Sequence, residues 1–222
     1  MKVLGILGSP HTKGNTVILL DAVLQGAASA GAEIEKVELA GLTMEFCQAC
    51  GKCYGTGDCL HDDDAERVKD KLAAADGLVL ASPNYVNSVT AQLKTLMDRC
   101  SLQIHCAMWK GKYGAAVSTA GGSGQEAVAE YLNGFMQVCG MTTVGIATAG
   151  AAGVAALANQ DAAVAEAERL GRDLVEACRE KRVYPEQAAL QAEYMARFKQ
   201  LVMHMAEKAP FQYEYWEKRG WL

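Results

Sequence analysis

The stretch VLGILGSPHTKGNT, residues 3–16, decides the fold, because a short apolar run passes straight into a loop of glycine and hydroxyl residues. The run at residues 3–7 has the length and character of a buried strand. The loop that follows opens a helix, so it presents backbone N–H groups and the positive end of a helix dipole, which favour an anion such as phosphate. The alternative is an ordinary helix start capped by the side chain of Asn15 or Thr16.

Two familiar phosphate loops do not match this stretch. The triphosphate loop G-x-x-x-x-G-K-[ST] fails because the lysine precedes the last glycine, and the dinucleotide fingerprint G-x-G-x-x-G is missing. The interpretation that remains is a binding site for a single phosphate group. Its candidate side chains are Ser9, His11, Thr12, Lys13, Asn15 and Thr16.

Apolar runs and amphipathic segments alternate along the rest of the chain. Further strands are predicted at residues 33–39, 77–82, 114–119 and 142–148, and helices at 16–30, 65–74, 86–102, 125–138 and 161–182. This alternation predicts an α/β fold, a doubly wound five-stranded parallel sheet covered by helices on both faces. The helix at 86–102 is expected to bury one stripe and to carry Gln92, Lys94 and Arg99 on its other, polar face.

Composition changes near Pro185, which divides the chain into two predicted parts. Residues 1–182 form the α/β domain, with a cysteine-rich insertion at 41–61. Residues 183–222 form a helical extension with an aromatic end, FQYEYWEKRGWL. That extension packs back on its own domain or covers a partner subunit, and the residues alone do not decide between the two.

The net charge and the first residues of the chain exclude several classes of function. The net charge is −5 and there is no basic cluster, so nucleic-acid binding is not expected. The apolar run after Met1 is too short for a signal peptide or a membrane span, which predicts a cytoplasmic protein with no membrane contact. In that compartment thiols stay reduced, so clustered cysteines indicate metal or redox chemistry in preference to a disulfide framework.

Two further strand ends carry residues suited to a ligand. In an open parallel sheet the ligand lies outside the carboxyl ends of the strands, where strand order reverses. The third strand ends in SPNY and the fourth in STAGGSG. Tyr85 offers an aromatic edge to a flat ring, and Gly121 and Gly122 allow the backbone close to the ring's polar edge.

The motifs GSPHTKGNT, ASPNYVNSVTAQLKTLMDR and STAGGSGQE, in this order, resemble those of the flavodoxin-like NAD(P)H-dependent FMN reductase superfamily. With CQACGKCYGTGDC after the second strand, the chain resembles the iron-sulfur flavoprotein branch. The resemblance implies a flavodoxin-like fold and an FMN site, with His11 where the family often has arginine. The implied residues are Ser9, His11, Asn15 and Thr16 at the phosphate, Pro83, Asn84 and Tyr85 beside the isoalloxazine and ribityl chain, and Thr119, Ala120, Gly121 and Gly122 at the pyrimidine edge.

The motif C-x2-C-x2-C-x5-C comprises Cys47, Cys50, Cys53 and Cys59. Four thiolates from one short loop suit a [4Fe–4S] cluster, which takes four cysteine ligands. Zinc usually takes two cysteine pairs with a longer spacer, and a dithiol pair or a structural loop needs no metal. The cluster is favoured, and the alternatives stay open. The four remaining cysteines are expected to be buried small hydrophobes, and Asp62 to Asp64 to cap a helix.

These features predict a flavin-dependent oxidoreductase that passes electrons between the cluster and FMN. The alternative is an NAD(P)H-dependent reductase of flavins or quinones with structural or dithiol cysteines, and a third is a regulatory module that binds flavin or metal. The donor or acceptor is expected to be NAD(P)H, another small molecule or a ferredoxin-like protein. Because FMN sites in this superfamily often lie at subunit contacts, the resemblance also implies a homodimer or homotetramer.

Overall fold

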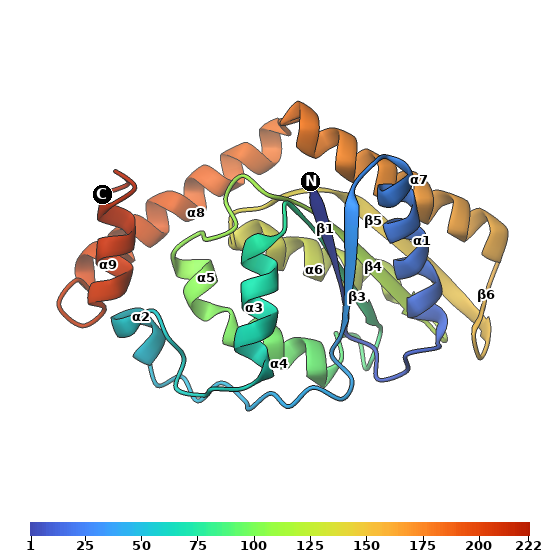
Figure 1. Ribbon diagram of the computed structural model, residues 1–222, viewed down its shortest axis with the longest axis horizontal. Coiled ribbons are helices and arrows are strands. Elements are labelled where there is room, and N and C mark those ends of the chain that lie inside the picture. Colours follow the sequence, from blue (N-terminus) through green and yellow to red (C-terminus); the bar gives the residue numbers. More distant parts are fainter.

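A computed structural model describes all residues, 1–222, as a central sheet between two layers of helices (Figure 1). The strands are β1 Lys2–Leu7, β2 Glu33–Glu38, β3 Gly77–Pro83, β4 Tyr113–Ala120, β5 Thr142–Gly153 and β6 Ala156–Leu157. The helices are α1 Asn15–Ser29, α2 Lys52–Thr56, α3 Asp64–Ala74, α4 Ala91–Arg99, α5 Ser101–His105, α6 Gln125–Val138, α7 Gln160–Glu180, α8 Pro185–His204 and α9 Pro210–Glu217.

The strand order is β2-β1-β3-β4-β5-β6, and all neighbours are parallel except β5 and β6. The order of the first five is that of flavodoxin-like sheets, with the switch point between β1 and β3. The predicted fold class is thus confirmed, but the predicted count of five strands was one too few. Alanine and glycine dominate residues 149–158, so the sequence shows no apolar alternation there, and the antiparallel β6 was missed.

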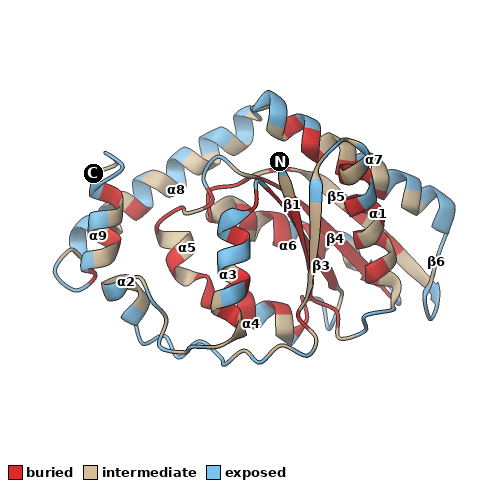
Figure 2. Ribbon diagram, in the orientation of Figure 1, coloured by how far each residue is buried: buried red, intermediate tan, exposed pale blue.

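Two apolar clusters form the core, one on each face of the sheet. One joins α1 and α7 to the sheet, and the other joins α3, α4 and α6 to the opposite face. The strand β4 is buried along its whole length (Figure 2). On the first face α1 and α7 approach so closely that a methyl group on Gly171 would overlap the carbonyl oxygen of Val23.

The predicted helix at 86–102 is shorter than expected and is divided in two. Residues 86–90 form a turn in which Val86 and Asn87 have positive φ angles, 53° and 59°. The helix α4 begins only at Ala91. Its N-cap residue is Thr90, whose side chain accepts a hydrogen bond from the Leu93 N–H. A positive φ at a β-branched residue is uncommon, which is why sequence periodicity extended the helix too far.

The C-terminal part runs from α8, which crosses the top of the view in Figure 1, to α9 at the far side from α7. Only Phe198 and Val202 of α8 are buried, and most of the helix is exposed or intermediate (Figure 2). A third apolar cluster holds this segment against α5 and includes Leu102, Cys106 and Trp216. The extension therefore packs back on its own domain, whereas contact with a partner subunit stays a prediction. None of the helices combines the length and apolar character needed to cross a bilayer.

Candidate functional site

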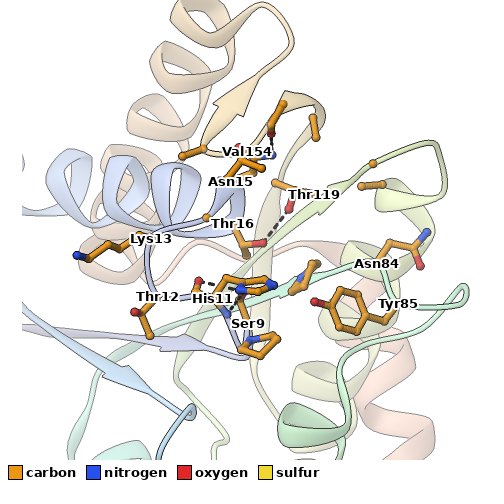
Figure 3. Close-up of a pocket in the computed structure, with 18 residues that line it drawn as sticks. Ser9, His11, Thr12, Lys13, Asn15, Thr16, Asn84, Tyr85, Thr119 and Val154 are labelled. Atoms are coloured by element: carbon orange, nitrogen blue, oxygen red, sulfur yellow. Dashed lines mark hydrogen bonds between the residues drawn. The ribbon is translucent and has the colours of Figure 1, made fainter.

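A pocket of about 620 Å³ lies outside the carboxyl ends of β1, β3 and β4 (Figure 3). Its walls come from the loop before α1, the turn after β3 and the end of β4. All the residues predicted to contact FMN border it except Gly122, which follows Gly121 in the same loop. Lys13 extends away from the other labelled side chains in Figure 3, while His11 lies among them.

The loop before α1 leaves the start of that helix open to the pocket. The Ser9 hydroxyl accepts a hydrogen bond from the His11 N–H at 3.1 Å and folds the loop over the strand tip. The N-cap residue is Gly14, and no side chain caps the helix. Capping by Asn15 or Thr16, the alternative considered from the sequence, is therefore wrong. The free N–H groups of the first turn and the helix dipole both favour an anion here.

Hydroxyl and amide groups from three elements converge on this pocket. The Thr16 and Thr119 hydroxyls are hydrogen-bonded at 2.7 Å and join α1 to β4. The Asn84 Nδ2 donates to the carbonyl of Ser123 at 2.7 Å. The side-chain oxygens of Asn15 and Asn84 are buried and have no hydrogen-bond partner. Buried polar atoms without partners are rare, and at a pocket wall they mark groups suited to a polar ligand.

The hairpin formed by β5 and β6 is a wall that sequence reasoning missed. Ala151, Gly153, Val154 and Ala155 border the pocket, although the strand was expected to end at Thr148. The Asn15 Nδ2 donates to the carbonyl of Gly153 at 3.0 Å and ties the hairpin to α1. The small residues of the hairpin give no amphipathic pattern. The only sequence signal for the hairpin is that its residues, like those of the preceding strand, carry no charge.

The four clustered cysteines border a second cavity, of about 160 Å³. The loop curls there because Ala49, Gly51 and Gly57 have positive φ angles of 51°, 74° and 87°. No three histidine, cysteine or acidic side chains lie close enough together to hold one metal ion. The thiols thus surround a space and do not meet at a point.

The thiols of this cavity affect one another electrostatically. Burial raises the pKa of the Cys53 thiol, and negative charge on Cys59 raises it further, while Lys69 lowers it. Lys69 and Arg99 are the two cationic side chains of the cavity wall. A set of thiolates here would need these charges to offset their mutual repulsion.

Arg99, expected on an exposed polar face, is buried and fastens both ends of the cysteine loop. Its guanidinium donates to the carbonyls of Glu45 and His61 and to both carboxylate oxygens of Asp63. Its side chain is 1% exposed. Burial by itself would lower the pKa of Arg99, but the hydrogen bonds to Asp63 and the charges of Cys59 and Asp63 raise it. Asp63 also caps α3 by accepting from the Ala65 N–H, as predicted for this acidic run.

The C-terminal extension packs against the second half of the cysteine loop, around α2, while Cys47 and Cys50 in its first half are exposed. A methyl group on Gly57 would lie 2.6 Å from the Phe211 ring of α9. The Tyr54 ring, next to Cys53, stacks on His105 at 4.7 Å, and the Trp216 Nε1 donates to the His105 carbonyl at 3.0 Å. Cys100, Cys106 and Cys139 are buried, as expected for small apolar residues, and Cys178 is half-buried.

The helix α4 runs from the loop after β1 to the cysteine cavity. At its start the Thr90 hydroxyl donates to the carbonyl of Gly8, in the loop after β1. At its end Arg99 borders the cysteine cavity. Its nine residues correspond to roughly 14 Å of helix. The loop after β1 and the cysteine cavity therefore lie at opposite ends of α4.

Comparison with known proteins places the chain among flavin-binding redox proteins. The family model described as NADPH-dependent FMN reductase matches residues 1–155. An iron-sulfur flavoprotein of Archaeoglobus fulgidus is 34% identical over 224 residues, 100% of both chains. Another, of Methanocaldococcus jannaschii, is 38% identical over 148 residues, 65% of this chain and 76% of its own. The solved NAD(P)H:quinone oxidoreductase of Methanothermobacter marburgensis has a TM-score of 0.62 at 19% identity, over 78% of this chain and 98% of its own, so it has the same fold.

Proposed function

Because the chain belongs to the NADPH-dependent FMN reductase family and to its iron-sulfur flavoprotein branch, we propose that it passes electrons between FMN and a [4Fe–4S] cluster. The chain is a flavin-dependent oxidoreductase. The observation that carries the proposal is that one chain holds two separate cavities, one bordered by the phosphate-type loop and one by all four motif cysteines.

The pocket at the strand ends fits FMN. Its volume lies in the range of cofactor pockets, roughly 300–1,000 Å³, and its walls combine an uncapped helix start with hydroxyls and a half-exposed tyrosine ring. In this proposal Ser9, Asn15 and Thr16 hold the phosphate, and Tyr85 lies beside the ring. FMN, when bound, can accept a hydride or single electrons, so no side chain has to act as nucleophile or base.

The cysteine cavity fits a cluster better than a single ion. Four thiols spaced around one cavity suit a body with several metal atoms, whereas one tetrahedral zinc ion needs its ligands about 2.3 Å from a common point. Cys47, Cys50, Cys53 and Cys59 would be the ligands. Lys69 and Arg99 would offset the negative charge, and the C-terminal extension packs beside Cys53 and Tyr54, while Cys47 and Cys50 are exposed.

A second candidate is a cluster-free NAD(P)H reductase in which two of the cysteines act as a dithiol. The absence of three converging ligands favours it. In either case the electron donor or acceptor is NAD(P)H, another small molecule or a ferredoxin-like protein. We also propose assembly into a homodimer or homotetramer, supported by the exposed apolar side chains of Val86 and Val154 near the pocket, each 98% exposed.

Anaerobic purification followed by absorption spectroscopy and iron analysis separates the two candidates. We expect flavin bands with broad iron–sulfur absorption and about four irons per chain. The Cys53→Ser variant should lose the broad absorption and the iron while its flavin bands remain, because one of four ligands is missing. Cys178→Ser, outside the motif, is the matched control and should keep both. Flavin without iron or acid-labile sulfide in the unaltered protein would favour the cluster-free reductase.

The Thr16→Val substitution should weaken FMN binding. It keeps the shape of the side chain but removes a hydroxyl that we place at the phosphate and that bonds Thr119. A hydrogen bond to a charged group contributes about 1.5–3 kcal/mol, so the dissociation constant should rise roughly ten- to a hundredfold. Titration of the apoprotein with FMN, followed by flavin fluorescence, measures this.

The Thr95→Val variant is the control for that titration. Thr95 is a buried threonine of α4 whose hydroxyl donates to the Ala91 carbonyl and does not border the pocket. If the two variants bind FMN equally well, Thr16 does not hold the phosphate.

A further inference from the structure

Arg99 has one N–H group that the protein leaves without a partner. A guanidinium carries five N–H donors, four on the two terminal nitrogens and one on Nε. The terminal nitrogens donate to two loop carbonyls and to the carboxylates of Asp63 and Glu66. The Nε of Arg99 is buried and has no hydrogen-bond partner.

The location of this group restricts what it can bond. The Arg99 side chain is 1% exposed, so bulk water does not reach the Nε–H group. Arg99 borders the cysteine cavity together with Cys59, and negative charge on Cys59 is among the causes that raise the pKa of Arg99. The carboxylates of Asp63 and Glu66 are already bonded to the terminal nitrogens, and Lys69 also pairs with Glu66. A buried charged donor without a partner is costly, and the cavity that Arg99 borders is the space beside this residue that can hold an acceptor.

We propose that the Nε–H of Arg99 donates a hydrogen bond to a sulfur atom of the iron–sulfur site at Cys59. This inference rests on the proposed function, because it requires the cavity to hold a cluster. A hydrogen bond and a fixed positive charge beside sulfur stabilise the more negative, reduced form, so they raise the reduction potential. Arg99 thus sets the potential of the cluster in addition to fastening the loop.

Labelling the unaltered protein with ¹⁵N-arginine tests the bond directly. The cluster is reduced anaerobically, and pulsed electron paramagnetic resonance records hyperfine coupling between the cluster spin and ¹⁵N. We expect a ¹⁵N coupling that disappears in Arg99→Lys and persists in Arg67→Lys, an exposed arginine of α3 paired with Asp64. No coupling in the unaltered protein, or a coupling that persists without Arg99, would overturn the inference.

The reduction potential gives a second readout that a purely structural role would not move. Lysine keeps the charge but lacks the Nε–H, so Arg99→Lys should have a more negative potential than both the unaltered protein and Arg67→Lys. An unchanged potential in a variant with a full complement of iron would contradict the inference. Failure of the proposed function can be distinguished from failure of this inference. If the proposed function is wrong, the unaltered protein contains no iron and gives no cluster signal.

Discussion

Replacing Gly171 with alanine should lower the free energy of unfolding by about 3 kcal/mol or more. The added methyl group would overlap the Val23 carbonyl oxygen and lie 2.8 Å from the Ala27 nitrogen, both in the backbone of α1. Two helix backbones cannot yield as a flexible side chain can, so α7 would have to move away from α1. Urea unfolding of the holoprotein, followed by circular dichroism, measures the loss.

The Gly134→Ala variant is the matched control for that substitution. Gly134 lies inside α6 and a methyl group there would meet no atom within 4 Å. Alanine is the better helix former, so this variant should be more stable by about 0.4–1 kcal/mol. The same chemical change should thus act with opposite sign at the two sites. Equal midpoints for both variants would contradict the tight α1–α7 contact.

Replacing Trp216 with alanine should lower the free energy of unfolding by about 3–5 kcal/mol and increase the exposure of the half-buried Cys53. The Trp216 side chain is 1% exposed and packs with Leu102, Cys106 and Phe198. Without it α9 loses its anchor beside α2, so we expect the iron–sulfur absorption to bleach several-fold faster in air while the flavin bands persist. Stability is measured by urea unfolding and bleaching by absorption against time.

Trp216→Phe separates the packing of this residue from its hydrogen bond. Phenylalanine retains an aromatic ring but not the Nε1 donor to the His105 carbonyl, so the loss should be nearer 1 kcal/mol. Bleaching as slow in Trp216→Ala as in Trp216→Phe would show that α9 does not protect the cysteines.

The sequence predicted most of the sheet and the pocket because their signals are local. Buried parallel strands appear as apolar runs, and the loop from Gly8 to Thr16 follows its strand directly. The turn at Val86 was missed because its left-handed backbone contradicts the preference of valine. The β5–β6 hairpin was missed because its small residues carry no periodicity.

The burial of Arg99 could not be predicted, because it depends on partners far away in the chain. Asp63 lies 36 residues before Arg99 and the Glu45 carbonyl 54 residues before it. Sequence periodicity predicts that a charged residue lies on the outer face of its helix. It contains no information about a distant loop that packs over that residue. The way α9 reaches the cysteine loop depends on similarly distant contacts between Gly57 and Phe211.

This contact between the first third of the chain and its last residues also orders events during synthesis. The ribosome completes the cysteine loop at Cys59, but the helix that packs against its second half begins only at Pro210, 151 residues later. At roughly 5–20 residues per second, translation takes about 8–30 s to cover that stretch. Throughout that interval the loop lacks its contacts with α9, so the cluster that we propose would have this period in which to assemble before the second half of the loop is packed.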